Sequence, residues 1–126
     1  MKLALDAMGG DNAPQINVDG AKLALEKIPT LEKIYMVGDG DTVKAACEAA
    51  GIANHPKIEF VHAPEVVTME ESGIMAVRQK KNSAQVKGML AVKNGEVDGF
   101  VSAGSTGATL AGGMFRLGRI EGVERP

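Results

Sequence analysis

The sequence predicts an α/β fold in which a parallel sheet is covered by helices on both faces. Short aliphatic runs begin near residues 2, 33, 58 and 98, and each run is followed by a turn rich in Gly, Asp, Ser or Pro. A segment of helical periodicity then follows each turn, and this is the order of strand–helix–strand crossovers that join parallel strands. The runs are apolar at successive positions, as expected of strands buried on both sides. The pattern indicates a three-layer sandwich.

The first unit consists of a strand over 2–7, a turn, and a helix over 16–28. Asp11 or Asn12 can cap this helix, with Pro14 in its first turn, where a missing N–H costs nothing. Apolar residues then recur at mostly helical spacing until a proline ends the pattern.

The middle of the chain contains two further strands. A strand is predicted over 33–37, followed by an Ala-rich helix over 43–50 that Gly51 stops. The third strand is predicted over 58–63. The segment 65–72 that follows it is ambiguous, because its apolar residues fit neither the helical nor the strand spacing.

The last part of the chain carries the fourth strand, over 98–103. Before it, residues 73–80 are weakly helical and 83–94 form a better helix. After it, a glycine-containing turn leads into a helix of small residues that ends near Gly118. Since the residues beyond Gly118 are polar and form no fifth strand, we expect residues 1–126 to be part of a larger enzyme; a natural small domain is the alternative.

Composition excludes several classes of function. The 126 residues include 14 Lys+Arg and 16 Asp+Glu, for a formal charge of -2. This balance gives no general attraction to nucleic acid or to an anionic bilayer, so an anion site must be local. No apolar run approaches the roughly 18 to 20 residues of a membrane span, and no secretory signal is present. We expect a soluble cytoplasmic protein that binds no nucleic acid.

The turn after the fourth strand is the best candidate for a binding site. Ligands of open parallel sheets lie beyond the carboxyl ends of the strands. There Gly104 and Gly107 let backbone amides approach an anion, and Ser105 and Thr106 add hydroxyl donors. A plain turn that needs glycine only for its backbone conformation is the alternative.

A cluster of cations precedes the helix over 83–94. Arg78, Lys80 and Lys81, followed by Ser83, could hold a phosphate group. The alternative is a solvated helix end, and Glu70 or Glu71 could pair with Arg78 or Lys80.

The turn after the first strand places two carboxylates around a glycine pair. Asp6 and Asp11 could orient substrate groups beside Gly9 and Gly10. It is equally consistent with the sequence that Asp11 caps a helix and Asp6 is a buried acceptor at the strand end. No metal site is predicted, because no third ligand lies at a useful spacing.

Nucleotide and zinc motifs do not occur. The dinucleotide pattern G-x-G-x-x-G fails after Gly38-Asp39-Gly40, because Val43 stands where the third glycine belongs. The sequence contains neither a P-loop motif nor a Cys/His cluster, so no cofactor is predicted.

Four short blocks of the sequence occur in the same order in a known family. They are Leu5–Pro14 (LDAMGGDNAP), Gly38-Asp39, Ala76–Ser83 (AVRQKKNS) and Val101–Ala108 (VSAGSTGA). In these blocks the chain resembles the N-terminal portion of the bacterial acyl-ACP:phosphate acyltransferases, the PlsX-type family. Two positions depart from the family pattern, since Ser105 stands where the family usually has Asn and Ala84 stands where it has Ser.

The resemblance implies a fold and an activity. The fold is the isocitrate/isopropylmalate-dehydrogenase-like α/β sandwich, with residues 1–126 as the N-terminal part of a single acyltransferase domain. The activity is transfer of a fatty acyl group from acyl carrier protein to inorganic phosphate, which gives acyl phosphate for phospholipid synthesis. The resemblance also implies a homodimer in the cytoplasm, with peripheral membrane contact left open.

The resemblance also suggests roles for the candidate residues. We expect the amides and hydroxyls of 104–107, with Arg78, Lys80 or Lys81, to hold phosphate, while residues 6–11 shape the neighbouring wall. Lys81 and Thr106 are the candidates for a catalytic role. An NAD-dependent dehydrogenase or phosphotransacetylase of the same fold, or a non-catalytic anion-binding fragment, is the alternative.

Overall fold

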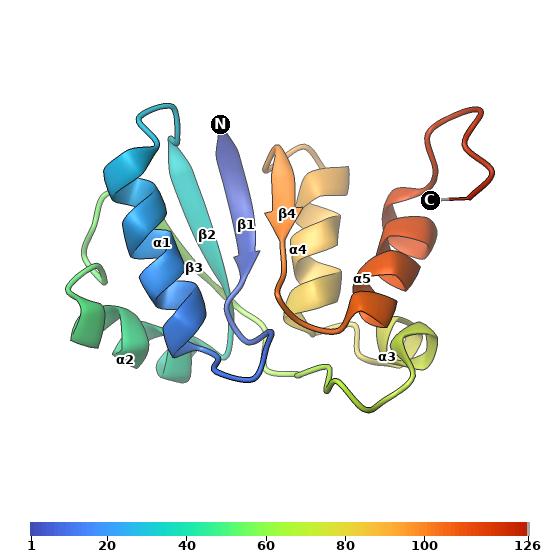
Figure 1. Cartoon of the computed structure of the whole chain (residues 1–126), viewed down its shortest axis with the longest axis horizontal. Helices are drawn as coiled ribbons and strands as arrows, with labels where there is room; N and C mark the ends of the chain where they lie inside the picture. The colour runs from blue at the N-terminus through green and yellow to red at the C-terminus, as the bar shows by residue number, and fades with distance from the viewer. Residues whose placement is uncertain (126) are drawn as a thin grey trace.

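A four-stranded parallel sheet with the strand order β3-β2-β1-β4 forms the centre of the computed structural model, which describes residues 1–125 (Figure 1). The strands are β1 (Lys2–Asp6), β2 (Lys33–Gly38), β3 (Ile58–His62) and β4 (Gly99–Val101). The helices are α1 (Gln15–Lys27), α2 (Gly40–Ala50), α3 (Gly73–Gln79), α4 (Ala84–Lys93), α5 (Thr106–Gly112) and the π-helix η1 (Gly113–Leu117). The predicted parallel α/β architecture is confirmed.

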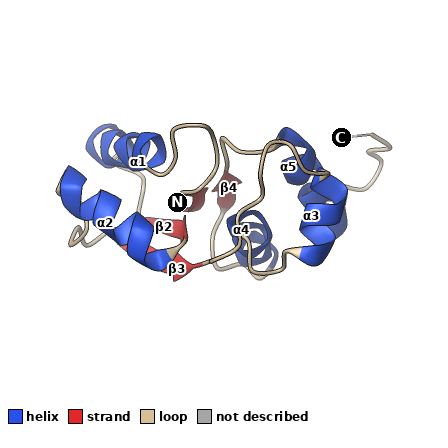
Figure 2. Ribbon diagram, turned by 90° about the horizontal axis from the view of Figure 1, so that it is seen from below, coloured by secondary structure: helices blue, strands red, loops and turns tan. Residues whose placement is uncertain are grey.

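Helices cover the two faces of the sheet unequally. On one face, α1 and α2 pack on β1 and β2 through an aliphatic cluster that includes Val18, Ile34 and Val43. On the other face, α4 packs on β1, β2 and β4, and α5 with η1 packs on the outside of α4 (Figure 2). The helix α3 then packs on α5. As a result, the helices on the α4 side form a thicker layer than those on the α1 side.

The start of α1 differs from the prediction. The helix begins after Pro14 without a side-chain cap, so the predicted cap by Asp11 or Asn12 is wrong. Residues 11–14 form a turn of their own, and the N–H of Val18 bonds to the carbonyl of Pro14. The helix is anchored instead by Asn17, whose side-chain amide donates to two carbonyls in the turn after β1.

Two other boundaries differ from the prediction and the rest agree. The helix predicted over 43–50 begins at Gly40, because the side chain of Asp39 caps it, and the strand predicted over 98–103 is limited to Gly99–Val101. The weakly helical segment is α3, capped by Ser72, and the ambiguous segment before it is irregular chain. The helix of small residues continues from α5 into η1 and ends at Gly118, as predicted. Within residues 1–125, every helix is too short or too polar to cross a bilayer.

Substitutions at two helical glycines test how closely α3 packs on α5. A Cβ on Gly73, at the start of α3, would overlap the backbone of Gly107 and Ala108, whereas a Cβ on Gly20 in α1 would meet nothing within 4 Å. We therefore expect Gly73→Ala to lower the free energy of unfolding by about 1–3 kcal/mol through overpacking. Gly20→Ala, the matched control, should raise it by about 0.5–1 kcal/mol, because alanine favours the helix.

Urea unfolding followed by circular dichroism measures both changes. An unfolding midpoint of Gly73→Ala at or above that of the unmodified chain would contradict the packing of α3 on α5.

Candidate functional site

The order of the strands places a topological switch point between β1 and β4. The chain proceeds from β1 outward to β2 and β3, and then returns to the other side of β1 to form β4. Because ligands of open α/β sheets bind beyond the carboxyl ends of strands at such a point, the turns after β1 and β4 mark the candidate site. Both turns contain residues that the sequence predicts to be functional.

The two turns touch through their backbones. A Cβ on Gly9 would lie 2.7 Å from the backbone nitrogen of Gly104 and 2.6 Å from Oδ2 of Asp6. A Cβ on Gly104 would lie 3.1 Å from the Cα of Gly9. Gly10 has a φ of 95°, which favours glycine. Glycine is therefore required where the turns meet, and the predicted first and last turns lie side by side.

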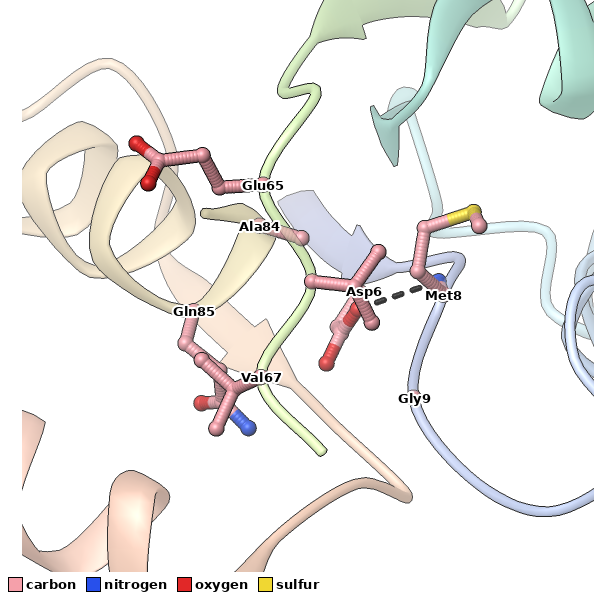
Figure 3. Close-up of a pocket in the computed structure, with 8 residues that line it drawn as sticks. Asp6, Met8, Gly9, Glu65, Val67, Ala84 and Gln85 are labelled. Carbon is pink, nitrogen blue, oxygen red and sulfur yellow. Dashed lines mark hydrogen bonds between the residues drawn. The ribbon is translucent and has the colours of Figure 1, made fainter. Parts of the chain in front are cut away.

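The carboxylate of Asp6 lies buried beneath this contact. Asp6 is 3% exposed. Its Oδ1 accepts a hydrogen bond of 3.0 Å from the N–H of Met8 (Figure 3). Its Oδ2 accepts one of 2.8 Å from the hydroxyl of Ser102. Burial raises the pKa of Asp6 above its ordinary value, and hydrogen bonds from Ser102, Met8 and Gly9 oppose that shift. Asp6 is thus a buried acceptor, while Asp11 is exposed.

The hydroxyl of Ser102 connects Asp6 to three other elements. Its oxygen accepts from the N–H of Gly104 and from Nε2 of Gln85, both at 3.0 Å. The Oε1 of Gln85 in turn accepts from the hydroxyl of Thr109 at 3.2 Å. A polar network therefore joins the ends of β1 and β4 to α4 and α5.

Sequence reasoning did not select the network residues Ser102, Gln85 and Thr109 as site residues. The position of Ser102 at the end of a predicted strand, directly before the glycine turn, is a signal that could have found it. Gln85 gives no such signal, because its burial depends on how α4 packs against α5.

In the turn that the sequence predicts to bind an anion, some polar groups already form hydrogen bonds and others do not. Ser105 is buried, and its hydroxyl oxygen accepts a 3.2 Å hydrogen bond from the N–H of Ala108 at the start of α5. Thr106 and Gly107 are exposed. Within residues 1–125, the backbone N–H groups of Ser105, Thr106 and Gly107 form no hydrogen bond. Three consecutive amides thus have no partner among the described residues, and two of them belong to the exposed Thr106 and Gly107, where an anion could approach.

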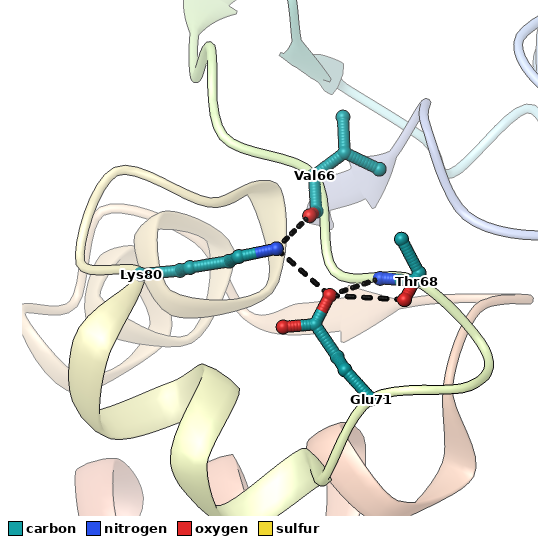
Figure 4. A network of polar contacts seen from close by, with 4 residues as sticks. All are labelled: Val66, Thr68, Glu71 and Lys80. Carbon is teal, nitrogen blue, oxygen red and sulfur yellow. Dashed lines mark hydrogen bonds and ion pairs between the residues drawn. The ribbon is translucent and has the colours of Figure 1, made fainter.

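The predicted cations contact other parts of the chain. The ammonium of Lys80 lies 2.7 Å from both Oε2 of Glu71 and the carbonyl of Val66, and it fixes the irregular segment before α3 (Figure 4). The guanidinium of Arg78 lies over the ring of Phe115, 5.1 Å from its centroid. The predicted possibility that Glu71 pairs with Lys80 is confirmed.

The other two residues of the cationic segment differ in exposure. Ser83 is fully buried, and its hydroxyl oxygen caps α4 by accepting from the N–H of Val86 at 3.3 Å. Lys81 is exposed and forms no ion pair with any residue in the described range 1–125. Of the three cations, Arg78 and Lys81 are exposed and form no ion pair within residues 1–125, while Lys80 is paired with Glu71.

A very small cavity of about 10 Å³ lies between the turn after β1 and the start of α4. Its polar side chains include Asp6 and Gln85, and Figure 3 shows the carboxylate of Glu65 turned away from Asp6. Because the buried carboxylate of Asp6 repels an anion, this pocket does not suit phosphate. An anion fits better on the exposed side of the turn, at Thr106 and Gly107.

Comparisons with known proteins agree on one family. A family model described as a fatty acid synthesis protein matches residues 1–126. A phosphate acyltransferase of Akkermansia muciniphila is 54% identical over 125 residues, which cover 99% of this chain and 36% of that protein. Phosphate acyltransferases of Pelotomaculum thermopropionicum and Staphylococcus aureus are 48% and 46% identical, and each match covers 100% of this chain and 36% of the relative. The chain thus spans about 36% of the length of these curated relatives.

The contact between Glu71 and Lys80 predicts a pH-dependent stability. Hydrogen bonds from Lys80 and from the N–H of Thr68 lower the pKa of Glu71. A lowered pKa in the folded state gives stability that is present above the ordinary value of about 4.3 and is lost as the pH falls through the lowered pKa. We expect Glu71→Gln to lower the thermal unfolding midpoint near neutral pH, and this difference to shrink as the pH falls below the ordinary pKa of about 4.3.

The exposed Glu26 of α1 provides the control, since Glu26→Gln should leave the midpoint nearly unchanged at every pH. A difference for Glu71→Gln that stays constant from neutral to acidic pH would show that its charge does not contribute.

Proposed function

Because this chain belongs to the fatty acid synthesis protein family, with phosphate acyltransferases among its relatives, we propose that it forms part of an enzyme that transfers a fatty acyl group from acyl carrier protein to inorganic phosphate. The product is acyl phosphate, which supplies phospholipid synthesis. The match over the whole chain supports this proposal over the dehydrogenase alternative. The activity belongs to the full-length protein, since the chain spans only about a third of its relatives.

The phosphate seat of this enzyme is the turn between β4 and α5. The observation that carries the proposal is the row of three available amides, Ser105 to Gly107, at the topological switch point. The exposed hydroxyl of Thr106 adds a donor in the same place. The amide of Gly104 is not available, because it already donates to Ser102.

Positive charge at the seat comes from Lys81 in this proposal. Lys80 pairs with Glu71, and Arg78 stacks on Phe115. In this proposal both residues have a structural role, since they hold the loop and the helix beside the seat. Lys81 follows directly after Lys80 and is exposed. Its flexible stem allows an ammonium to approach an anion as a point charge.

The reaction requires only binding and charge stabilisation. An oxygen of phosphate attacks the carbonyl carbon of the thioester, and the carbonyl oxygen becomes an oxyanion. The C–O bond to phosphate forms, the C–S bond breaks, and the departing thiolate of the carrier takes up a proton. Orienting phosphate and stabilising the oxyanion supply most of the catalysis. No cofactor and no covalent enzyme intermediate take part.

The full-length enzyme is expected to be a homodimer in the cytoplasm, as the family resemblance implies. Apolar side chains that remain exposed on α5 and η1, namely Leu110, Met114 and Phe115, support an assembly in which this surface is covered. Exposed apolar patches of this kind mark interaction sites. Peripheral membrane contact remains a second expectation of the resemblance.

Acyl phosphate formation by the full-length protein tests the assignment of the seat. We expect Thr106→Ala and Lys81→Ala each to raise the KM for phosphate by roughly tenfold, because each removes one interaction with a charged ligand. Lys44→Ala, which removes an exposed lysine from α2, is the control and should leave the KM unchanged.

If both Thr106→Ala and Lys81→Ala keep the KM for phosphate and the kcat of the unmodified enzyme, the assignment to these residues is wrong. If the unmodified full-length protein forms no acyl phosphate, the proposed function itself is wrong.

A further inference from the structure

One buried side chain holds both ends of the turn that contains the proposed phosphate seat. Nε2 of Gln85 donates to the hydroxyl oxygen of Ser102, directly before the turn. Oε1 of Gln85 accepts from the hydroxyl of Thr109, directly after it. Gln85 is 3% exposed and lies in the first turn of α4, which packs on the sheet. The amide therefore spans residues 103–108 from a fixed position.

The hydrogen bonds around Ser102 have only one direction. The oxygen of Ser102 accepts from two N–H groups, those of Gly104 and Gln85, so its single proton is left for the carboxylate of Asp6. The side-chain amide of Gln85 then presents its nitrogen to Ser102 and its oxygen to the hydroxyl of Thr109, which shares its proton between Gln85 at 3.2 Å and the carbonyl oxygen of Ser105 at 3.0 Å. Among the described residues, no buried side-chain nitrogen or oxygen lacks a partner.

This arrangement decides which amides of the turn are available. The N–H of Gly104 is directed inward to Ser102, and the hydroxyl oxygen of Ser105 is used at the start of α5. The next three amides, Ser105 to Gly107, remain without a partner within residues 1–125. Ser102 and Thr109 contribute the hydrogen bonds that tie the turn to α4, and Ala108 adds an apolar contact with the cluster that contains Val86 of α4.

We propose that Gln85 is a positioning residue of the phosphate seat, which acts through Ser102 and Thr109 and does not touch phosphate. The inference rests on the proposed function, since it names what keeps that site in its binding geometry. A turn held at both ends retains one arrangement of its amides, so less conformational freedom is lost when an anion binds. Without Gln85, the same amides are present but less ordered.

Steady-state kinetics of the full-length enzyme with inorganic phosphate test this role. Gln85→Leu keeps the approximate size of the side chain and removes both hydrogen bonds. We expect it to raise the KM for phosphate about fivefold, the effect of one or two neutral hydrogen bonds. The KM for acyl carrier protein should not change. A residue that only stabilises the fold would lower the unfolding midpoint and leave the KM of the folded enzyme unchanged.

A matched pair at Thr109 keeps the test decisive if Gln85→Leu does not fold. Thr109→Ser retains the hydroxyl and should bind phosphate as the unmodified enzyme does, while Thr109→Val retains the shape and should raise the KM. In the double variant, Gln85→Leu and Thr109→Val should raise the KM by less than the product of their separate effects, because they share the hydrogen bond between Gln85 and Thr109. The effects still add in part, since Thr109→Val also removes the hydrogen bond to the carbonyl of Ser105.

The outcomes separate the two proposals. If Thr106→Ala raises the KM for phosphate but Gln85→Leu and Thr109→Val do not, the positioning role is overturned and the seat stands. Equal KM values for Thr109→Ser and Thr109→Val in folded enzymes likewise overturn the role. If Thr106→Ala also has no effect, the seat itself has been wrongly assigned.

Discussion

The hydrogen bond between the buried carboxylate of Asp6 and the hydroxyl of Ser102 is the interaction on which the site depends. It joins the end of β1 to the end of β4, and the two residues that form it are 96 positions apart in the sequence. Asp6 is 3% exposed, so its carboxylate must be compensated by donors, and these are N–H groups of the turn after β1 and the hydroxyl of Ser102 at the end of β4. The charge of Asp6 thus draws together backbone segments that would otherwise be independent loops.

Glycine makes this compensation geometrically possible. Gly9 and Gly104 lie so close that any side chain on Gly9 would collide with the carboxylate or with the neighbouring turn. The two glycine backbones cover Asp6, which excludes water from it and raises its pKa. The glycines of both turns are therefore required for the close packing of the turns, and the candidate anion site results from that packing.

The sequence predicted the fold well, because the fold rests on local signals. Aliphatic runs, glycine stops and helical spacing located all four strands and the helices that follow them, and the two glycine turns were recognised as neighbours. Side-chain partners were predicted less well. Ser83 and Ser105 were considered as ligands, but each directly precedes a helix and caps it. The network through Gln85 could not be predicted, since it exists only when α4, β4 and α5 are in contact.

The cationic segment shows why a cluster of like charges is weak evidence for a phosphate site. Arg78, Lys80 and Lys81 are neighbours in sequence, yet the end of α3 directs them to different surroundings. Arg78 lies over an aromatic ring, Lys80 lies on a carboxylate and a carbonyl, and Lys81 lies in solvent. A positive charge that is already paired adds little to the binding of an anion, because the ligand must compete with the existing partner. The backbone amides of Ser105 to Gly107 have no such competitor within residues 1–125, and for this reason the proposed seat rests on these amides, with Lys81 in a supporting role.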